Sequence, residues 1–282
     1  MNGMQKLWYR SVQIVLSMGS RILPWRSPAL LQGPGSSRKI PTLLKDCGVQ
    51  RAMVVTGRHV GKTLAPAILE NIRSSGLSCV HFDQVEANPS ASTVEAIVRQ
   101  YREEGCDGFV AIGGGSPMDA AKAAAARIAR PGRSLSQMAG FFKVMRRLPP
   151  LIAVPTTAGT GSETTLAAVI TDSATHHKAS INDPSLIPHV AVLDPALTMG
   201  LPSAVTAATG MDALCHAVEA YTNHTYCTKL ENRMAKEAVR LIYQYLRPAY
   251  ENGSNREARQ QMQRAAFCAG RAFTRGCVGN VH

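Results

Sequence analysis

The sequence predicts a doubly wound, Rossmann-like α/β domain followed by an all-α domain. Up to residue 196, short apolar runs alternate with amphipathic segments, a pattern that builds βαβ units around a parallel sheet. From residue 202 onward, amphipathic stretches of helical periodicity follow one another with no strand between them. We therefore expect an N-terminal extension at 1–26, a dinucleotide-binding α/β domain at 27–196 and a helical domain at 197–282.

Strands are expected at the apolar and β-branched runs, and helices at the amphipathic segments between them. The expected strands are 30–32, 52–56, 79–82, 108–112, 151–154, 166–171, 178–181 and 190–193. The expected helices of the α/β part are 36–47, 60–74, 92–104 and 116–129, with a loop or short helix over 130–142. Those of the helical part are 202–221, 226–250 and 254–275.

Composition narrows the class of protein. The 282 residues suffice for one large or two ordinary domains, and a hydrophobic content of 45% with 23 glycines is typical of a soluble α/β protein. No apolar run is long enough to span a bilayer, so we expect no transmembrane segment. The seven cysteines are odd in number and form no CxxC pair, which indicates packed thiols in a reducing compartment, and hence a cytoplasmic protein.

The net charge of +12 raises the question of nucleic-acid binding. Part of the excess lies in residues 1–45, which hold no acidic residue. We interpret the remaining basic residues as spread among acidic residues and as lacking aromatic residues between them, so we expect no nucleic-acid partner. Residues 4–23 have the pattern of a basic amphipathic helix. Such a helix could dock on a protein surface, lie on a membrane, or act as a presequence to the mitochondrial matrix.

A glycine-rich turn at residues 113–115 joins a very apolar strand to an Ala-rich helix. Ser116 is the expected N-cap, Pro117 the first helical residue, and Asp119 the capping-box residue. Because glycines expose the backbone N–H groups and the helix dipole is positive there, the turn favours a diphosphate. The alternative is an ordinary strand-to-helix turn with no ligand.

Two further turns follow strands. Residues 155–163 form a second glycine- and threonine-rich loop. Residues 56–63 resemble a Walker A loop, but Thr56 stands where that motif requires glycine. Gly57 occupies the place where an acidic residue would bind the ribose 2′-hydroxyl of NAD, and Arg58 and His59 are cations that could accept a 2′-phosphate instead. An ordinary exposed turn is the alternative for these residues.

Asp212 and His216 are four residues apart on an expected helix, so both side chains project from one face. A carboxylate and an imidazole together suit Fe²⁺, Zn²⁺ or Mn²⁺. The alternative is a hydrogen-bonded pair on a solvated helix face. The sequence ends at another histidine, His282.

Taken together, four motifs resemble the iron-containing (group III) alcohol dehydrogenases. They are 113–122, 155–163, Lys178 with 183–194, and 210–221, and the resemblance extends from about residue 27 to residue 282. Glycerol dehydrogenase and dehydroquinate synthase are similar in fold, but the forms of the first two motifs fit the alcohol dehydrogenases better. The resemblance implies a dehydroquinate synthase-like architecture that is C-terminally incomplete, since a fourth metal-binding histidine and a histidine near the nicotinamide would lie beyond residue 282.

The resemblance also implies an activity and its residues. It implies hydride transfer between NAD or NADP and a small alcohol or aldehyde, in a homo-oligomer that binds Fe²⁺ or possibly Zn²⁺. Asp212, His216 and His282 would be metal ligands and catalytic through the metal. The cofactor would contact the two turns and Lys178, with NADP(H) or relaxed preference expected from Gly57. A nucleotide-binding protein with impaired catalysis and a glycerol dehydrogenase-like enzyme are the alternatives. The implied cofactor residues are Gly57, Arg58, Gly114, Gly115, Ser116, Asp119, Thr156, Thr157, Thr160 and Lys178.

Overall fold

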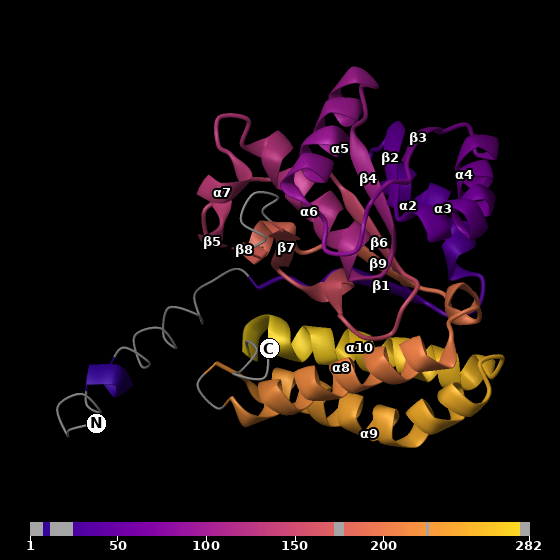
Figure 1. The fold of residues 1–282 in the computed structure, drawn as a ribbon, viewed down its shortest axis with the longest axis vertical. Coiled ribbons are helices and arrows are strands. Elements are labelled where there is room, and N and C mark those ends of the chain that lie inside the picture. The colour runs from indigo at the N-terminus through magenta and orange to yellow at the C-terminus, as the bar shows by residue number, and fades with distance from the viewer. Residues whose placement is uncertain (1–7, 12–24, 172–177, 224–225, 277–282) are drawn as a thin grey trace.

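The computed structural model describes residues 8–11, 25–171, 178–223 and 226–276. Most of the predicted amphipathic helix at 4–23 lies outside these residues. The main sheet is parallel and six-stranded, in the order β1-β9-β6-β4-β2-β3. Its strands are β1 (Ala29–Gln32), β2 (Arg51–Thr56), β3 (Ser78–Phe82), β4 (Gly108–Gly113), β6 (Leu151–Pro155) and β9 (Val190–Leu193). The predicted doubly wound sheet is therefore confirmed (Figure 1).

Helices cover both faces of this sheet and bury an apolar core against each. One core lies under α5 (Ala91–Glu103) and α6 (Gly115–Ala129) and the other under α2 (Ile40–Asp46) and α4 (Ala65–Ser74). Every residue of β4 and β6 is buried, as their continuous apolar sequence predicts for central parallel strands. The carboxyl ends of β2, β4 and β6 consequently share one edge of the sheet.

Several elements differ from the sequence-based expectation. The expected helix 60–74 is divided into α3 (Arg58–Thr63) and α4, because Pro66 in the first turn of α4 cannot continue a helix. The expected helix 36–47 is the 3₁₀ helix η1 (Ser36–Lys39) followed by α2. The 130–142 segment contains α7 (Leu135–Met138) and a short strand, β5 (Gly140–Phe141). With β7 (Ala167–Thr171) and β8 (Lys178–Asn182), this strand forms a separate sheet in the order β5-β8-β7.

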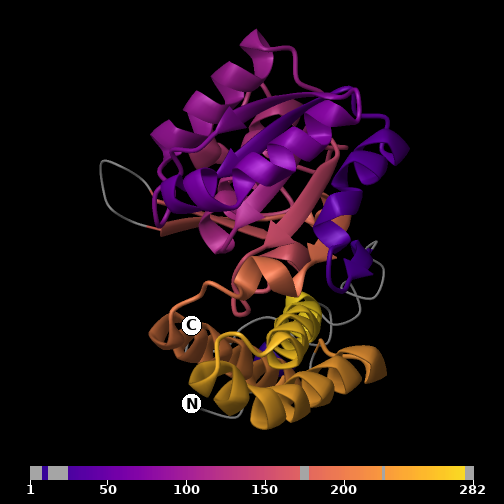
Figure 2. The same ribbon diagram turned by 90° about the vertical axis from the view of Figure 1, so that its right-hand side faces the viewer.

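The helical part consists of α8 (Ser203–Thr222), α9 (Lys229–Glu251) and α10 (Arg256–Gly276), which pack around their own apolar core. Figures 1 and 2 show these helices as a layer beside the α/β domain, with α10, in yellow, next to it. Besides η1, the described part of the chain contains the 3₁₀ helices η2 (Ser162–Thr164), η3 (Pro184–Leu186) and η4 (Pro195–Thr198). Over the described residues, no helix combines the length and apolar character needed to cross a membrane.

Candidate dinucleotide site and metal pair

The glycine turn after β4 lies directly against the second glycine-rich loop. Gly113 has a φ of +151°, and a Cβ atom there would lie 2.7 Å from the ring of Pro117. A Cβ on Gly114 would lie 3.4 Å from Thr157 Oγ1, and one on Gly115 3.2 Å from Thr160 Cγ2. The two glycines therefore let the turns approach each other closely, and no Cβ atom at these positions covers the backbone N–H groups at the start of α6.

The predicted capping box at this turn is wrong. Helix α6 begins at Gly115 and its N-cap is Gly114, which makes no side-chain cap hydrogen bond. Ser116 therefore lies inside the first turn, where its hydroxyl accepts a hydrogen bond from the Asn88 backbone N–H at 3.3 Å. Asp119 instead accepts hydrogen bonds from the Ser162 hydroxyl at 2.7 Å and the Val169 backbone N–H at 3.1 Å. The carboxylate thus ties α6 to the segment after β6 rather than capping the helix.

A buried ammonium group holds the two turns together. Lys122 is fully buried, and its Nζ lies within 3.0 Å of five oxygen atoms. These are the carbonyl and hydroxyl oxygens of Ser162 and Thr165 and the carbonyl oxygen of Ala167. The stem of the lysine leaves α6, which carries the first turn, and its head ends in the second loop, so Lys122 and Asp119 together link the two turns.

Two carboxyl groups near Lys122 offset part of the free-energy cost of burying its ammonium group. Burial lowers the pKa of Lys122 to about 8, while the nearby carboxyl groups of Asp119 and Glu163 act in the opposite direction. Burial raises the pKa of Glu163 to about 7, and it also raises the pKa of Asp119 against the attraction of Lys122. Lys122 therefore remains charged at neutral pH, as its oxygen-only surroundings require.

The remaining predicted cofactor residues approach the same edge from two sides. Lys178 is exposed on β8, where it pairs in register with Thr171. Thr171 in turn bridges to Ser90, close to the Asn88 backbone that contacts Ser116. On the other side, Thr56, which precedes the predicted residues Gly57 and Arg58, pairs in register with Ile112 of β4, which leads into the glycine turn. Thr156 lies against this turn, because its backbone N–H donates to the Gly113 carbonyl at 2.9 Å.

The segment after β2 is helical from Arg58 onward, with Gly57 as its N-cap. The Walker-like residues therefore lie within a helix rather than in a loop that wraps a phosphate. Arg58 and His59 are exposed, so the guanidinium group and the imidazole ring face solvent at this edge. The structure also brings a carboxyl group to this helix, because a Cβ on Gly61 would lie 2.8 Å from Asp83 Cβ.

The second glycine-rich loop makes the contact between the α/β domain and the helices. A Cβ on Gly159 would lie 2.6 Å from Thr209 Cβ on α8, and one on Gly161 would lie 2.7 Å from Gly270 Cα on α10. Thr274 of α10 donates to the Thr164 carbonyl at 3.3 Å. The loop that faces the phosphate-binding turn is thus also packed against α8, the helix that carries Asp212 and His216, two of the three predicted metal ligands.

Asp212 and His216 lie one turn apart on α8, as predicted. Asp212 Oδ1 and His216 Nε2 are 3.8 Å apart, and the imidazole is buried while the carboxylate is about one-third exposed. Phe273 of α10 stacks on the imidazole with ring centroids 4.3 Å apart, which fixes the plane of the ring. A nitrogen and an oxygen donor on one helix face fit part of a divalent-ion site.

The third predicted ligand, His282, lies outside the described residues. Within those residues, no group of three or more His, Cys, Asp or Glu side chains is placed to hold a metal ion. The structure therefore brings together Gly114, Gly115, Thr157 and Thr160, and separately pairs Asp212 with His216.

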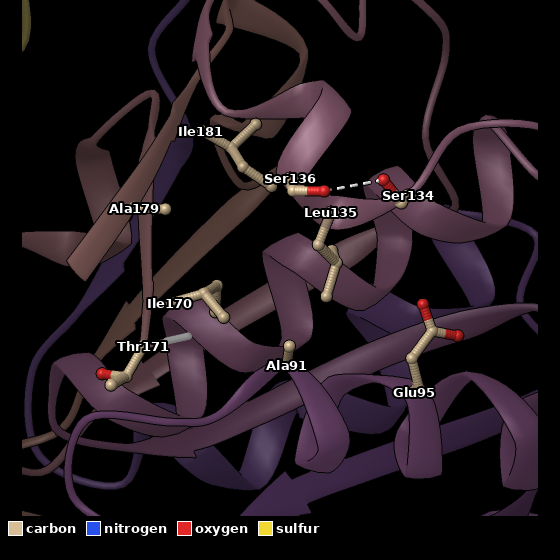
Figure 3. Close-up of a pocket in the computed structure, with 9 residues that line it drawn as sticks. All are labelled: Ala91, Glu95, Ser134, Leu135, Ser136, Ile170, Thr171, Ala179 and Ile181. Carbon is tan, nitrogen blue, oxygen red and sulfur yellow. Dashed lines mark hydrogen bonds between the residues drawn. The ribbon is translucent and has the colours of Figure 1, made fainter. Parts of the chain in front are cut away.

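Two cavities of the described chain are lined by none of the predicted site residues, although the first includes Thr171 and Ala179 next to Lys178. One, of about 220 Å³, is bounded by the start of α5, by α7 and by the β7–β8 strands, with Leu135, Ile170 and Ile181 in its wall (Figure 3). The other, of about 740 Å³, lies between η1, α4 and the segment after β9. Neither cavity is lined by a residue of the two turns or by Asp212 or His216, so neither cavity is the candidate site.

Sequence reasoning assigned no role to Lys122, Ser162 or Glu163, although each lies within a motif that it identified. The signal was present for Lys122, since it is the single charged residue in the run Ala120–Ala126 of a helix whose other residues there are all alanine. A cation in so apolar a stretch is buried only when it has partners. For Ser162 and Glu163, the partners come from a segment some 40 residues away, which no local pattern shows.

Comparison with protein families agrees with this architecture. A family model described as iron-containing alcohol dehydrogenase matches residues 27–195, and a model for the C-terminal part of the same family matches residues 206–282. The chain belongs to this family. Residues 1–26 lie outside both matched ranges.

Individual relatives and structures support the assignment. The chain is 41% identical over 256 residues to the NAD-dependent methanol dehydrogenase of Bacillus methanolicus, covering 90% of this chain and 67% of that protein. It is 38% identical to the 1,3-propanediol dehydrogenase of Citrobacter freundii, covering 89% of this chain and 65% of that protein. The family member described here thus spans about two thirds of the length of these relatives.

Solved structures of similar proteins share this fold. A 1,3-propanediol oxidoreductase superposes with a TM-score of 0.88 at 37% identity, covering 93% of this chain and 69% of that one. A sulfoacetaldehyde reductase from Bifidobacterium kashiwanohense, solved with NAD⁺, gives a TM-score of 0.83 at 31% identity over the same shares.

Proposed function

We propose that this chain carries the dinucleotide site and part of the metal site of an alcohol dehydrogenase that interconverts small alcohols and aldehydes. The observation that supports this most directly is the close approach of Gly114 and Gly115, at the start of α6, to Thr157 and Thr160 of the second loop, where no Cβ stands between the two turns. The family membership supports it independently, and relatives are named as NAD-dependent or solved with NAD⁺.

In this proposal the first turn binds the pyrophosphate. The backbone N–H groups at the start of α6 point out of the helix, and the helix dipole adds partial positive charge at the same place. Thr157 and Thr160 face these glycines and provide hydroxyl groups for the ribose and phosphate oxygens. Lys122 holds the spacing between the turns, so it acts through them and need not touch the cofactor.

At the adenosine end, Gly57 provides no carboxylate for a ribose 2′-hydroxyl, and Arg58 is exposed beside it. We propose that the site accepts NADPH at least as well as NADH, because a guanidinium can pair with a 2′-phosphate. A nicotinamide cofactor held by these residues would supply the hydride acceptor or donor.

On the helical side, Asp212 and His216 would hold a divalent ion, Fe²⁺ or Zn²⁺, with His282 as a third ligand. Such an ion supplies Lewis acidity that favours the alkoxide form of an alcohol. The contribution of the chain is orientation, because the Phe273 ring fixes the imidazole and the packing of α8 against the second loop keeps the ligand pair beside the turns.

Binding measurements test the two halves of the proposal separately. We expect Gly115→Val to weaken NADPH and NADH binding by at least about tenfold in a fluorescence titration, since its branched side chain enters the space beside Thr160. Gly132→Val is the matched control, because a Cβ at Gly132 meets no atom within 4 Å. Equal loss in both variants would contradict the assignment of the turn, and a clear NADH preference in the unaltered chain would contradict the role of Gly57 and Arg58.

The metal half is tested by Asp212→Ala, with Glu251→Ala as a control carboxylate paired with Arg247 on the exposed side of α9. We expect the first variant to lose Fe²⁺ or Zn²⁺ in equilibrium dialysis and the second to retain it. Unchanged metal uptake by Asp212→Ala would refute the assignment of the ligand pair, whatever the outcome for the cofactor.

A further inference from the structure

The segment Gly140–Arg147, here called the basic–aromatic loop, presents large apolar side chains to solvent. The exposed fraction is 64% for Phe141, 43% for Phe142 and 50% for Met145. Single exposed apolar residues are common on soluble proteins, but three within five positions form a local cluster. The rings of Phe141 and Phe142 lie beside each other, with centroids 6.0 Å apart.

The backbone of this loop holds these side chains in an unfavourable conformation. Phe142 has a φ of +56° and Met145 a φ of +42°, and among the described non-glycine residues only Asn88 shares this region. Bulky residues rarely adopt positive φ, and such strain persists only where the surrounding structure imposes it. Phe142 and Met145 thus carry both a conformational cost and a solvation cost, whereas Phe141 carries the solvation cost alone.

Firm contacts impose this conformation. The buried Asp183 carboxylate accepts hydrogen bonds from the backbone N–H groups of Val144 and Met145, at 3.0 and 2.9 Å. Arg130 and Arg133 donate to the carbonyl oxygens of Val144 and Lys143, both at 2.7 Å. Val144 itself is fully buried. The apolar side chains on either side of Val144 are therefore held outward by a rigid base.

The surroundings of the loop are strongly basic. Residues 120–162 contain no Asp or Glu, so the expectation that basic residues are spread among acids is wrong for this stretch. Desolvation, followed by the positive charges of Arg146 and Arg133, lowers the pKa of Arg130, while the buried Asp183 carboxylate acts in the opposite direction. The cations of the loop and its base are Arg130, Arg133, Lys143, Arg146 and Arg147.

We propose that the basic–aromatic loop docks on an anionic lipid surface. Phe141, Phe142 and Met145 would enter the boundary between headgroups and acyl chains, while the surrounding cations contact headgroup phosphates. Figure 1 places β5 and α7, which adjoin the loop, at the outer margin of the α/β domain, away from α3 and α4. A flat surface can therefore reach this part of the fold.

Charge complementarity and the shape of the loop favour lipid over other anionic partners. Single-stranded RNA would neutralise the cations and stack bases on Phe141 and Phe142, but it offers no apolar layer for Met145, whereas a lipid surface offers anionic headgroups and apolar chains in one layer. A partner peptide needs a groove for its anchoring side chains. No residue of the loop lines either of the two cavities described above.

Vesicle co-sedimentation tests the proposal. We expect the chain to pellet with phosphatidylcholine vesicles that contain phosphatidylserine, much less with pure phosphatidylcholine, and less as salt increases. Phe141→Ser/Phe142→Ser should reduce partitioning at least about tenfold, and Arg146→Gln/Arg147→Gln about fivefold for each charge. Tyr243→Ser is the matched control, because this aromatic residue on α9 is 92% exposed and lies outside the loop.

Competition identifies what the loop recognises. Inorganic phosphate at the concentration of the lipid headgroups should not release the protein, because it offers no apolar contact. Partitioning that is unaffected by the Phe variant, or that is equal on neutral and anionic vesicles, would overturn the proposal. Complete release of the protein by single-stranded RNA would assign the loop to RNA and overturn the proposal. Self-association that appears in gel filtration and buries Phe141 would assign the loop to a second copy of the chain and overturn the proposal as well.

Discussion

Replacing Lys122 with methionine should destabilise the fold strongly, because the substitution keeps the apolar stem and removes the charged head. An ammonium group has three hydrogens, so it serves at most three of the five surrounding oxygens at a time. Each buried oxygen that loses its donor costs about 1–1.5 kcal/mol, and the nearby Asp119 and Glu163 lose their cation. We expect a loss of about 3–5 kcal/mol in the free energy of unfolding.

Urea unfolding followed by circular dichroism at pH 7 measures this loss. Arg127→Met is the matched control, since Arg127 lies on the same helix and pairs at 2.7 Å with Glu95, whose side chain is 45% exposed. That pair is expected to contribute less than about 1 kcal/mol. If Lys122→Met stays within about 1 kcal/mol of the unaltered protein, the ammonium does not clamp the two turns and the reasoning fails.

The other predictions concern the same contact region. Because the pKa of Glu163 is raised from 4.5 to about 7, its contribution to stability is fully present below pH 4.5 and is lost as the pH rises toward 7. Glu163→Gln should therefore raise the free energy of unfolding at pH 8, by up to about 3 kcal/mol, and leave it little changed at pH 4.5; equal urea midpoints of the two proteins at pH 8 would contradict this. Gly270→Ala places a Cβ 2.3 Å from Thr164 Oγ1 and 2.8 Å from the Gly161 carbonyl, so it should cost about 2 kcal/mol despite the better helix propensity of alanine. The melting temperature measures this cost, with Gly132→Ala, in open surroundings, as its control; similar melting temperatures for both variants would argue against close packing of α10 on the loop.

The sequence sufficed for the parts of the fold that depend on local pattern. The strands β2, β4, β6 and β9 are short apolar runs bounded by turn residues, and such runs are recognisable one at a time. The helices α8 to α10 have long periodic stretches, so their existence and approximate ends were predicted as well. The glycine turn was identified because it joins a buried strand to a helix.

The errors have physical reasons. The capping box at Ser116 was wrong because glycines lack the side chain that normally marks a helix start, and the N-cap lies two residues earlier, at Gly114. The strand β5 was missed because two residues carry no periodicity, and its pairing with β8 comes from residues 181–182. The network around Lys122 was missed because it depends on tertiary contacts. Asp212 and His216 were paired correctly since helical spacing alone places them on one face.

The position of β1 at the edge of the main sheet has a consequence for synthesis of the chain. Its neighbour in the sheet is β9. Just after β1, the Gly35 backbone N–H donates a hydrogen bond to the carboxylate of Asp194, 159 residues later. A ribosome releases β1 first, so this strand waits, unpaired along both edges, until β9 emerges. Helix α2 and strands β2 to β4 can assemble during that interval. Strand β9 then pairs with β6 on one side and with β1 on the other, which adds the first strand to the sheet last. Nascent chains halted before residue 190 should thus display a free strand to chaperones.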